Sequence, residues 1–381
     1  MGGLRSLSSA EKMTKIMKTT QTLILSLATL VFALSSCSTA RLAATTEPAS
    51  RWSEQKANDW YAAQPWLVGA DYINASAINQ IEMWSADTYN PTEIDRELGW
   101  AESLGFNTLR VYLSSVVYDN DPKGLISRID NFLGICQRHG IRPLFVFFDD
   151  CWNEEGTYGR QPAPKPGVHN SGWVQDPSVS LRKDTVSLYP KMERYVKDVL
   201  GTFREDSRIL LWDLWNEPGN SKHTVATLPL MKRVFGWARQ VNPSQPITAG
   251  LWSWQKDFDA LNAFQAQNSD VISYHNYESA EAHRQIIKYL SIFNRPLVCT
   301  EYMARTNNCL FKDVLPVLKA NKVVAINWGL VSGKTNTIFA WDKPMPDKKE
   351  PSVWFHDIFR QDGSPFSQDE VDLIRSLTGK K

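Results

Sequence analysis

Residues 209–218 read Ile-Leu-Leu-Trp-Asp-Leu-Trp-Asn-Glu-Pro and predict a buried strand that ends in an acidic residue. The first four residues form a continuous apolar run, which is typical of a parallel strand covered on both faces. Pro218 cannot donate a hydrogen bond to a sheet ladder, and it disfavours helical backbone angles at Glu217. We therefore expect Glu217 to be extended at the carboxyl end of this strand, where parallel barrels carry their functional residues.

A second strand also ends in a glutamate. Residues 297–301 read Leu-Val-Cys-Thr-Glu and follow Pro296, which marks the start of the strand. Glu217 and Glu301 lie 84 residues apart, which accommodates about three repeats of strand and helix at roughly 30 residues each. An isolated Glu-Pro pair is most simply a surface turn, but two acidic strand ends favour carboxylates that meet across the mouth of a closed barrel.

The whole chain alternates between strand and helix patterns. Its 381 residues and 43% apolar content suffice for a single α/β domain, a (β/α)8 TIM barrel of about 250 residues with long βα loops. We expect strands at residues 66–71, 108–113, 142–148, 209–216, 247–251, 271–274, 297–300 and 324–328. Helices are expected at residues 91–104, 125–139, 189–203 and 369–377, the last with Ser367 as its cap. A doubly wound open sheet is the alternative, but no glycine-rich phosphate loop follows any early strand.

The two acidic strand ends resemble those of a known family. Trp-Asn-Glu-Pro at 215–218, together with Thr-Glu-Tyr at 300–302, resembles clan A glycoside hydrolases, and among them family 5 (cellulase/mannanase-like). The resemblance covers most of the mature chain and implies a retaining glycoside hydrolase that cleaves β-glycosidic bonds in a poly- or oligosaccharide. It implies that Glu301 is the nucleophile and Glu217 the acid and base of a double displacement. Their carboxyl groups are then expected about 5 to 5.5 Å apart.

The resemblance also assigns substrate-binding positions in strands two and four. Arg110 matches the family arginine that holds the nucleophile ionised through a charge-assisted hydrogen bond. A salt bridge to Asp213 inside the barrel is the structural alternative, and both roles are compatible. Asn216 resembles the residue that binds the sugar 2-hydroxyl. Strict alternation would send Asn216 and Glu217 to opposite faces, so we expect the strand to bulge or end there.

Strands six and eight supply three more candidates. His-Asn-Tyr at 275–277 resembles the family's His-Xaa-Tyr, in which His275 shapes the first sugar site and the Tyr277 hydroxyl contacts the nucleophile. A lone histidine is more often structural, but its position at a strand end favours a place in the site. Trp328 resembles the aromatic platform beneath the sugar at the cleavage point. A tryptophan that merely plugs the barrel mouth is the alternative.

The end of strand three departs from the family pattern. Family 5 members often carry a histidine there, whereas this chain has Asp149-Asp150, which we expect to bind sugar hydroxyls, with Asp149 in the site. Residues 149–188 then form a stretch with four prolines and four glycines, and a loop of this length is usually functional. We expect it to wall one side of the site and to present Trp152 to the sugar. Further candidates at the mouth are Trp173, Trp252, Trp254 and the loop at Lys334.

Bulk charge excludes several classes of partner. A net charge of +1 and a pI near 7.6 provide no field for nucleic acid, so a neutral β-linked poly- or oligosaccharide fits better. Fifteen tryptophans offer flat faces for sugar rings, although most tryptophans in any protein fill the core. Cys136, Cys151, Cys299 and Cys309 are spaced like neither a zinc site nor a dense disulfide framework. We expect no metal and no cofactor.

The amino terminus, residues 1–37, is predicted to be a lipoprotein signal peptide. Three lysines precede an apolar run at 23–34 that is too short to span a bilayer comfortably. The run leads into Leu-Ser-Ser-Cys, which resembles a bacterial lipobox in which Cys37 is lipidated. An uncleaved helix or ordinary secretion is the alternative. Residues 38–60 are then a tether and 61–381 the catalytic barrel, held in the cell envelope by a lipid anchor alone, on either the periplasmic or the surface face.

Two classes of function compete at this stage. The rival to the hydrolase is a non-catalytic glycan-binding lipoprotein on the same barrel, which the intact pair of glutamates argues against. Within the enzymes, a β-mannanase, xylanase or glucanase and an exo-acting β-glycosidase all remain open, because fold does not decide the substrate. A transglycosylase would use the same residues.

Overall fold

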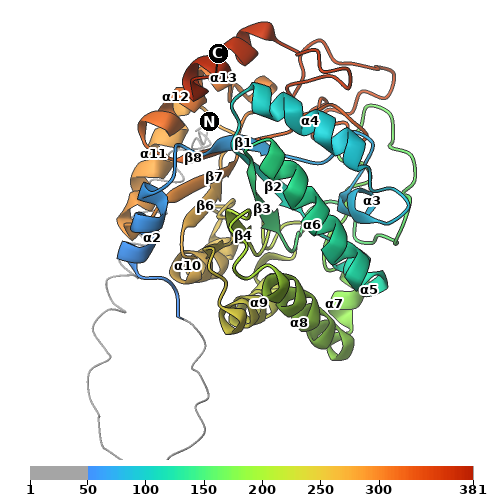
Figure 1. The fold of residues 1–381 in the computed structure, drawn as a ribbon, viewed down its shortest axis with the longest axis vertical. Coiled ribbons are helices and arrows are strands. Elements are labelled where there is room, and N and C mark those ends of the chain that lie inside the picture. Colours follow the sequence, from blue (N-terminus) through green and yellow to red (C-terminus); the bar gives the residue numbers. More distant parts are fainter. Residues whose placement is uncertain (1–49, 381) are drawn as a thin grey trace, which may run out of the picture.

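The computed structural model describes residues 50–380, which form a parallel barrel ringed by helices (Figure 1). One sheet contains eight strands in the order β5-β4-β3-β2-β1-β8-β7-β6, which confirms the predicted (β/α)8 barrel. An isolated bridge between Leu251 and Tyr274 joins β5 to β6, so the barrel is nearly closed. The strands are β1 (Val68–Asp71), β2 (Thr108–Tyr112), β3 (Arg142–Val146), β4 (Leu211–Asp213), β5 (Ile247–Thr248), β6 (Ile272–His275), β7 (Leu297–Glu301) and β8 (Val324–Trp328).

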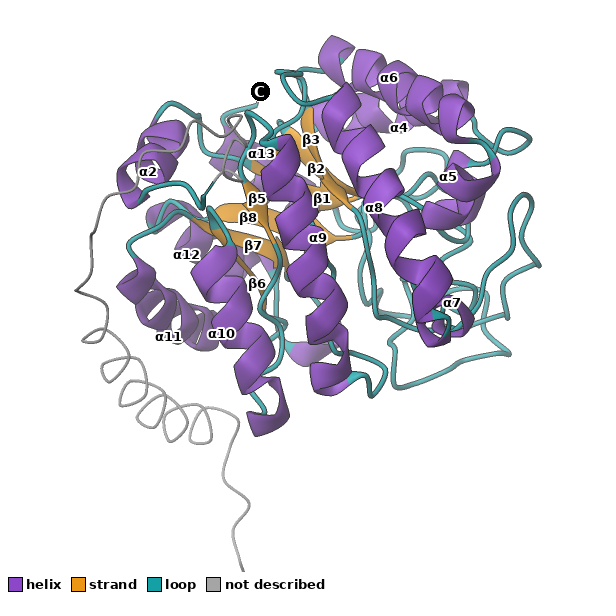
Figure 2. Cartoon of the chain, turned by 90° about the horizontal axis from the view of Figure 1, so that it is seen from below, coloured by secondary structure: helices purple, strands orange, loops and turns teal. Residues whose placement is uncertain are grey.

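Helices follow the strands and enclose them (Figure 2). The α-helices are α2 (Glu54–Ala62), α3 (Gln80–Trp84), α4 (Pro91–Ser103), α5 (Ser115–Asn120), α6 (Pro122–Arg138), α7 (Val179–Lys183), α8 (Thr185–Thr202), α9 (Leu228–Val241), α10 (Asp259–Asn268), α11 (Ala280–Leu290), α12 (Phe311–Ala320) and α13 (Gln368–Thr378). Short 3-10 helices are η1 (Thr224–Thr227), η2 (Lys256–Phe258), η3 (Ser291–Phe293) and η4 (Arg305–Asn307).

Local chemistry explains where several helices begin. The side chain of Asn90 accepts a backbone hydrogen bond at the start of α4, and Pro91 takes the first helical position. Asp121 and Pro122 do the same for α6. At α13 the cap is Ser367, as predicted from the sequence. These signals are local, and they were recognised from the sequence for α4 and α13, whereas α6 and α8 begin three and four residues before their predicted starts.

The amino-terminal end of the barrel is filled by aliphatic side chains and covered by α2. The aliphatic residues are Leu67, Leu144, Leu210, Leu211, Val271, Val298, Val324 and Ile326. Trp60 and Tyr61 of α2 pack against them, and the Tyr61 hydroxyl donates to the Lys322 carbonyl at 2.6 Å. Arg51 Nε donates to the Ser269 carbonyl at 2.6 Å. The prediction of a tether over 38–60 is therefore wrong from Arg51 onward, because aromatic contacts with the barrel order a segment whose own pattern is polar.

Two loops meet at the opposite end of the barrel. Residues 149–188 follow β3 and residues 329–367 follow β8. The first segment was predicted to be a loop throughout, but its last part contains α7 and the start of α8. Asn170 N donates to the Thr335 carbonyl at 2.7 Å, and Met345 N donates to the Gly167 carbonyl at 2.9 Å. Backbone hydrogen bonds thus join the two loops over one side of the mouth.

Some features predicted from the sequence lie outside the described residues. Cys37 and the signal peptide lie there, so the lipid anchor stays a prediction. Within residues 50–380, no helix is long and apolar enough to cross a membrane. The four cysteines of this part of the chain are buried and unpaired with one another.

Gly69 tests the tight pairing of β1 with β2. A Cβ atom at Gly69 would lie 1.8 Å from the Thr108 carbonyl oxygen, a backbone atom that cannot swing aside. We expect Gly69→Ala to lower the free energy of unfolding by about 3 kcal/mol or more, measured by urea denaturation. The matched control is Gly134→Ala in α6, where nothing lies within 4 Å of the new methyl group, and where we expect a gain of about 0.5 to 1 kcal/mol. Equal effects at both sites would contradict the packing at this strand pair.

Candidate active site

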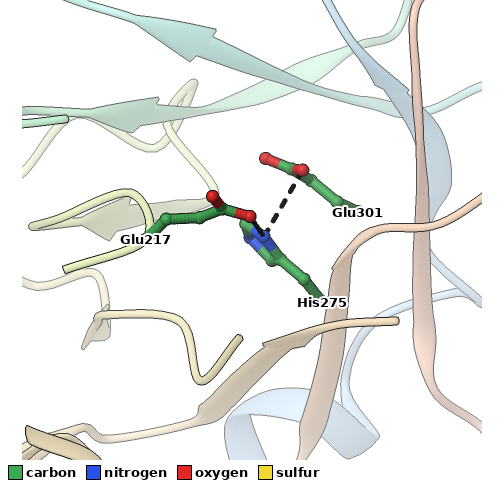
Figure 3. Close-up of side chains that lie close together, drawn as sticks. All are labelled: Glu217, His275 and Glu301. Atoms are coloured by element: carbon green, nitrogen blue, oxygen red, sulfur yellow. Dashed lines mark hydrogen bonds and ion pairs between the residues drawn. The ribbon is translucent and has the colours of Figure 1, made fainter. Parts of the chain in front are cut away.

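Glu217 and Glu301 converge at the mouth of the barrel, with His275 between them (Figure 3). His275 Nδ1 lies 2.9 Å from Glu217 Oε1 and 3.4 Å from Glu301 Oε2. One oxygen of each carboxylate lies within 4.8 Å of the other. Such a close approach of two carboxylate oxygens is compatible with the roughly 5 to 5.5 Å between the carboxyl groups of retaining pairs.

The backbone at Glu217 differs from the prediction. Its φ is 42°, in the left-handed region, so the residue is not extended as expected. The regular part of β4 ends at Asp213, and Asn216 N still donates to the Phe148 carbonyl at 2.7 Å. The left-handed turn after Asn216 breaks the strand alternation and lets Asn216 and Glu217 both line the cleft. Such strain costs about 1–3 kcal/mol and is typical of functional positions.

Arg110 connects the two strand ends. Its Nη1 donates to Glu301 Oε1 at 2.8 Å and to Asp71 Oδ1 at 2.9 Å. Its Nη2 donates to Asp213 Oδ2 at 2.9 Å and to Asn216 Oδ1 at 2.7 Å. The two roles weighed for Arg110, partner of Glu301 and core salt bridge to Asp213, therefore hold together.

Burial dominates the electrostatics of the site. It raises the pKa of Glu217, and it raises the pKa of Glu301, to which the neighbouring Glu217 charge adds. His275, Arg110 and the Tyr277 hydroxyl oppose the increase at Glu301. The increase in the pKa of Glu217 is opposed by hydrogen bonds from Cys151 and Asn220 and by the positive charge of Arg110.

Asp71 explains how one arginine serves three carboxyl groups. Burial raises the pKa of Asp71 well above its usual value, and its Oδ2 is buried without a hydrogen-bond partner among the described residues. Both observations favour a protonated Asp71. The charge of Arg110 is then shared between Asp213 and Glu301.

The predicted residues of strands six and eight reach the same cleft. The Tyr277 hydroxyl donates to Glu301 Oε2 at 2.7 Å, as the resemblance implied. Burial lowers the pKa of His275 to about 4, so its ring is neutral near pH 7. Trp328 is buried at the floor of the cleft and packs edge-on against Tyr112 and Trp173. It both fills the mouth and borders the site.

The acidic pair after β3 plays a different part from the predicted one. Asp149 borders the cleft, but its carboxylate accepts from Asn216 Nδ2 at 3.0 Å, Trp173 Nε1 at 2.8 Å and Cys151 N at 2.8 Å. It therefore orients Asn216 and has little capacity left for sugar. Asp150 is fully buried and forms an ion pair with Arg182 at 2.5 Å, so the idea that it binds sugar hydroxyls is wrong.

The tryptophans predicted to contact sugar differ in the exposed fraction of their side chains. Trp152 is 41% exposed on the cleft wall, whereas Trp173 is 2% exposed and belongs to the packing beneath. Trp252 and Trp254 line the open part of the cleft. Lys334 instead pairs with Glu82 at 3.0 Å.

Cys151 and Asn220 contact Glu217 but were missed as site residues. Cys151 Sγ lies 3.2 Å from Glu217 Oε2, and Asn220 Nδ2 donates to the same oxygen at 2.5 Å. Cys151 lies in the loop that follows β3, beside the Asp149-Asp150 pair that the sequence had already singled out, so the rule that strand ends converge was a signal for it. Asn220 depends on the turn after Pro218, which carries no such signal.

The cleft has a volume of ≈ 1910 Å³ and opens toward one side. Trp341 and His356 of the 329–367 segment border the cleft together with His169 of the 149–188 segment. Trp341 and His356 also pack against Tyr277, whose hydroxyl bonds Glu301. The cleft continues past Glu217 toward the loops after β4 and β5. Residues on that side include Asn220, Ser221, Trp252, Ser253 and Trp254.

Glu217, His275 and Glu301 are also the one set among the described residues with the spacing of a metal site. Two carboxylates and an imidazole suit several divalent ions. The expectation that the protein uses no metal stays a prediction.

The chain belongs to glycoside hydrolase family 5, because the family model described as "Cellulase (glycosyl hydrolase family 5)" matches residues 70–333, more than half of the chain. It is therefore a retaining hydrolase of β-glycosidic bonds on a TIM barrel, with the carboxyl pair in place. No curated protein sequence matches it significantly.

Similar solved structures share the fold. An exo-β-1,4-mannosidase from Opitutaceae bacterium strain TAV5 is 18% identical with a TM-score of 0.54, over 82% of this chain but 60% of that longer one. A family 5 mannosidase from Rhizomucor miehei is 17% identical with a TM-score of 0.51, over 84% of this chain and 94% of that one. An endo-1,4-β-mannanase from the same fungus is 13% identical with a TM-score of 0.52, over 81% and 95%.

The charge network predicts a large cost for losing Arg110. Arg110→Met leaves buried carboxylates without their cation, and we expect the free energy of unfolding to fall by about 3–5 kcal/mol in urea titrations. Arg138→Met is the control, because its ion pair with Asp95 is half-exposed, and there we expect a change below about 1 kcal/mol. An Arg110→Met protein as stable as the parent would show that the carboxyl groups do not need the guanidinium.

Proposed function

We propose that this chain is an exo-acting retaining β-glycosidase that releases terminal sugars from β-linked, mannose-containing oligosaccharides. The observation that carries the exo assignment is the junction of the two loops, with backbone hydrogen bonds at 2.7 and 2.9 Å, over the side of the cleft near Glu301. The mannoside assignment is supported by the names of several similar structures.

We assign the nucleophile to Glu301 and the acid and base to Glu217. Glu301 attacks the anomeric carbon while Glu217 protonates the departing oxygen, which gives a covalent glycosyl ester. Glu217 then removes a proton from water as the water displaces Glu301. The arginine and tyrosine donors on Glu301 support an ionised nucleophile. Glu217 has no arginine or lysine partner among the described residues, and burial raises its pKa, which supports its role as the proton carrier.

The same assignment gives the cleft a direction. The acid must lie beside the leaving group, so the leaving group occupies the open side past Glu217. The sugar that becomes bound to Glu301 then points toward the loop junction. A junction held by main-chain hydrogen bonds leaves no room for further sugars beyond that ring, which supports removal of one terminal sugar at a time.

For location, we propose a lipid anchor at Cys37 in the cell envelope. The support is the lipobox-like Leu-Ser-Ser-Cys after a short apolar run. A single acyl chain binds membranes only reversibly, so stable anchoring takes more than one chain.

The different roles of the two glutamates predict different behaviour of their alanine variants. Glu301→Ala should lose turnover by several orders of magnitude on every substrate and fail to trap a fluorosugar. Glu217→Ala should still form the intermediate from a dinitrophenyl glycoside, whose leaving group needs little protonation, and added azide should yield a β-glycosyl azide. Trapping by Glu301→Ala with none by Glu217→Ala would reverse the roles.

The raised pKa values also predict the pH profile. Activity should fall as pH drops through the raised pKa of Glu301, which must be ionised, and as pH rises through that of Glu217, which must carry a proton. The wild type should show both limbs of kcat/KM on a 4-nitrophenyl glycoside, whereas Glu217→Gln on a dinitrophenyl glycoside should show the acid limb alone. An unchanged alkaline limb would assign it to another group.

Exo action predicts the first products from a reduced β-1,4-manno-oligosaccharide. We expect single sugars and an alditol shortened by one unit, resolved by mass spectrometry at early times. A β-mannan solution should keep its viscosity while reducing sugar accumulates. Internal fragments or an early fall in viscosity would contradict exo action.

The anchor predicts a mature protein that starts at a lipidated Cys37 and fractionates with membranes. Mass spectrometry of the amino-terminal peptide measures this, with Cys37→Ser as the control that should stay unprocessed. An intact bond between residues 36 and 37 in the wild-type protein would contradict the proposal.

A further inference from the structure

Two histidines that the chemistry above does not use lie at the closed end of the cleft. His169 comes from the 149–188 loop and His356 from the 329–367 loop, and their ring centroids lie 5.6 Å apart. Their exposed fractions are 4% and 1%, yet both border the cleft. Trp152 packs beside His169, and Trp341 packs against both imidazoles. The pair therefore belongs to the wall where the two loops meet.

Backbone carbonyls fix the tautomer of both rings. His169 Nδ1 lies 2.8 Å from the Phe339 carbonyl oxygen, and His356 Nδ1 lies 2.6 Å from the Met303 carbonyl oxygen. A carbonyl oxygen only accepts, so each Nδ1 must carry the proton and donate. Each Nε2 is then left with a lone pair. Neither Nε2 has a hydrogen-bond partner among the described residues.

Burial keeps the rings neutral. It lowers the pKa of His169 to about 4 and that of His356 well below its usual value, with a further decrease for His356 from the neighbouring His169. Near neutral pH both Nε2 atoms therefore accept hydrogen bonds and cannot donate them. An acceptor that a ligand shields from water without offering a donor costs free energy, so a ligand that fills this end of the cleft must bring donors.

We propose that His169 and His356 form a hydroxyl-recognising pair, which accepts hydrogen bonds from the edge of the terminal sugar opposite its anomeric carbon, where C3 and C4 carry their hydroxyl groups. The inference rests on the proposed function for the direction of the sugar. It adds a specificity rule, namely that the terminal sugar must carry free hydroxyls on this edge. Sugars methylated, acylated or extended there lack the donor and meet the loop junction.

A metal site is a poorer account of the pair. Neutral histidines with carbonyl-anchored Nδ1 atoms are common metal ligands, but a bound ion needs further donors nearby. The neighbours of these rings are Trp152, Trp341, Phe355 and Tyr277. Among the described residues, the set with metal-like spacing is the one around Glu217. Aromatic faces beside hydroxyl acceptors fit a sugar ring better.

The test combines side-chain and substrate changes. The variants are His169→Phe and His356→Phe, which keep a ring but remove the acceptor, and His169→Gln and His356→Gln, which keep an acceptor near the Nε2 position. His139→Phe, at the end of α6 and away from the cleft, is the control. Each is assayed on the 4-nitrophenyl β-glycoside that the wild type hydrolyses fastest and on its 3-deoxy and 4-deoxy counterparts.

We expect each Phe variant to lose about 10- to 100-fold in kcat/KM on the parent glycoside, since a hydroxyl site left unpaired discriminates strongly. On the deoxy glycoside that lacks the matching hydroxyl, the same variant should lose less than about threefold relative to wild type. The Gln variants should recover part of the loss. His139→Phe should match the wild type on all substrates.

Equal losses of kcat/KM on the parent and deoxy glycosides would show that the histidines only pack against their neighbours, and would overturn the inference. A Phe variant with no loss on the parent glycoside would overturn it too. Thermal unfolding identifies a variant that fails to fold. In that case the test uses the wild type alone, by comparing its kcat/KM on the parent and deoxy glycosides. Equal kcat/KM values on these substrates would overturn the proposal.

Calorimetry separates this inference from the proposed function. Glu301→Gln, which does not turn over, is titrated with the methyl β-glycoside and its 4-deoxy counterpart, alone and combined with His356→Phe. If product analysis shows internal cleavage while the histidine-dependent preference for the hydroxylated sugar persists in binding, exo action and the exclusion of extended sugars fail, but hydroxyl recognition by the histidine pair stands. If terminal sugars are released without that preference, the inference fails and exo action stands.

Discussion

The guanidinium of Arg110 lies inside the barrel with no exposed side-chain surface, and it bonds carboxyl groups from β1, β4 and β7. A buried cation of this kind is stable only when its donors are paired, so the strand ends that supply the carboxylates must meet at this point. The same constraint orients Asn216 through its carbonyl oxygen and holds Glu301 beside Tyr112 and Tyr277. The arrangement of the strand ends in the site thus follows from the need to pair the buried guanidinium of Arg110 with carboxyl groups.

Glu217 has the opposite environment. It stands on a left-handed turn, where Cys151 and Asn220 bond one carboxylate oxygen and His275 the other. No arginine or lysine pairs with it among the described residues. The two glutamates therefore have different partners, a guanidinium for Glu301 and uncharged groups for Glu217, which suits the two different roles in a double displacement.

The two long loops add what the barrel itself does not specify. The loops after β3 and β8 lie far apart in the chain, but main-chain hydrogen bonds join them and carry His169 and His356 to one wall. The barrel holds the carboxyl pair, whereas the loop junction sets the shape of the cleft. Substrate range in such a fold is accordingly a property of the loops.

The sequence alone was enough to predict the barrel, the order of its strands along the chain and the convergence of Glu217 and Glu301. The signals used were apolar runs, proline and glycine positions and helix caps, which act over a few residues and recur in each strand and helix unit of the barrel. Tertiary contacts decided the rest. Trp60 and Tyr61 order α2 against the barrel end, Asp150 turns inward to Arg182, and Glu217 adopts a positive φ. Each outcome depends on a partner distant in sequence or on strain that packing offsets, and neither is encoded in local residue patterns.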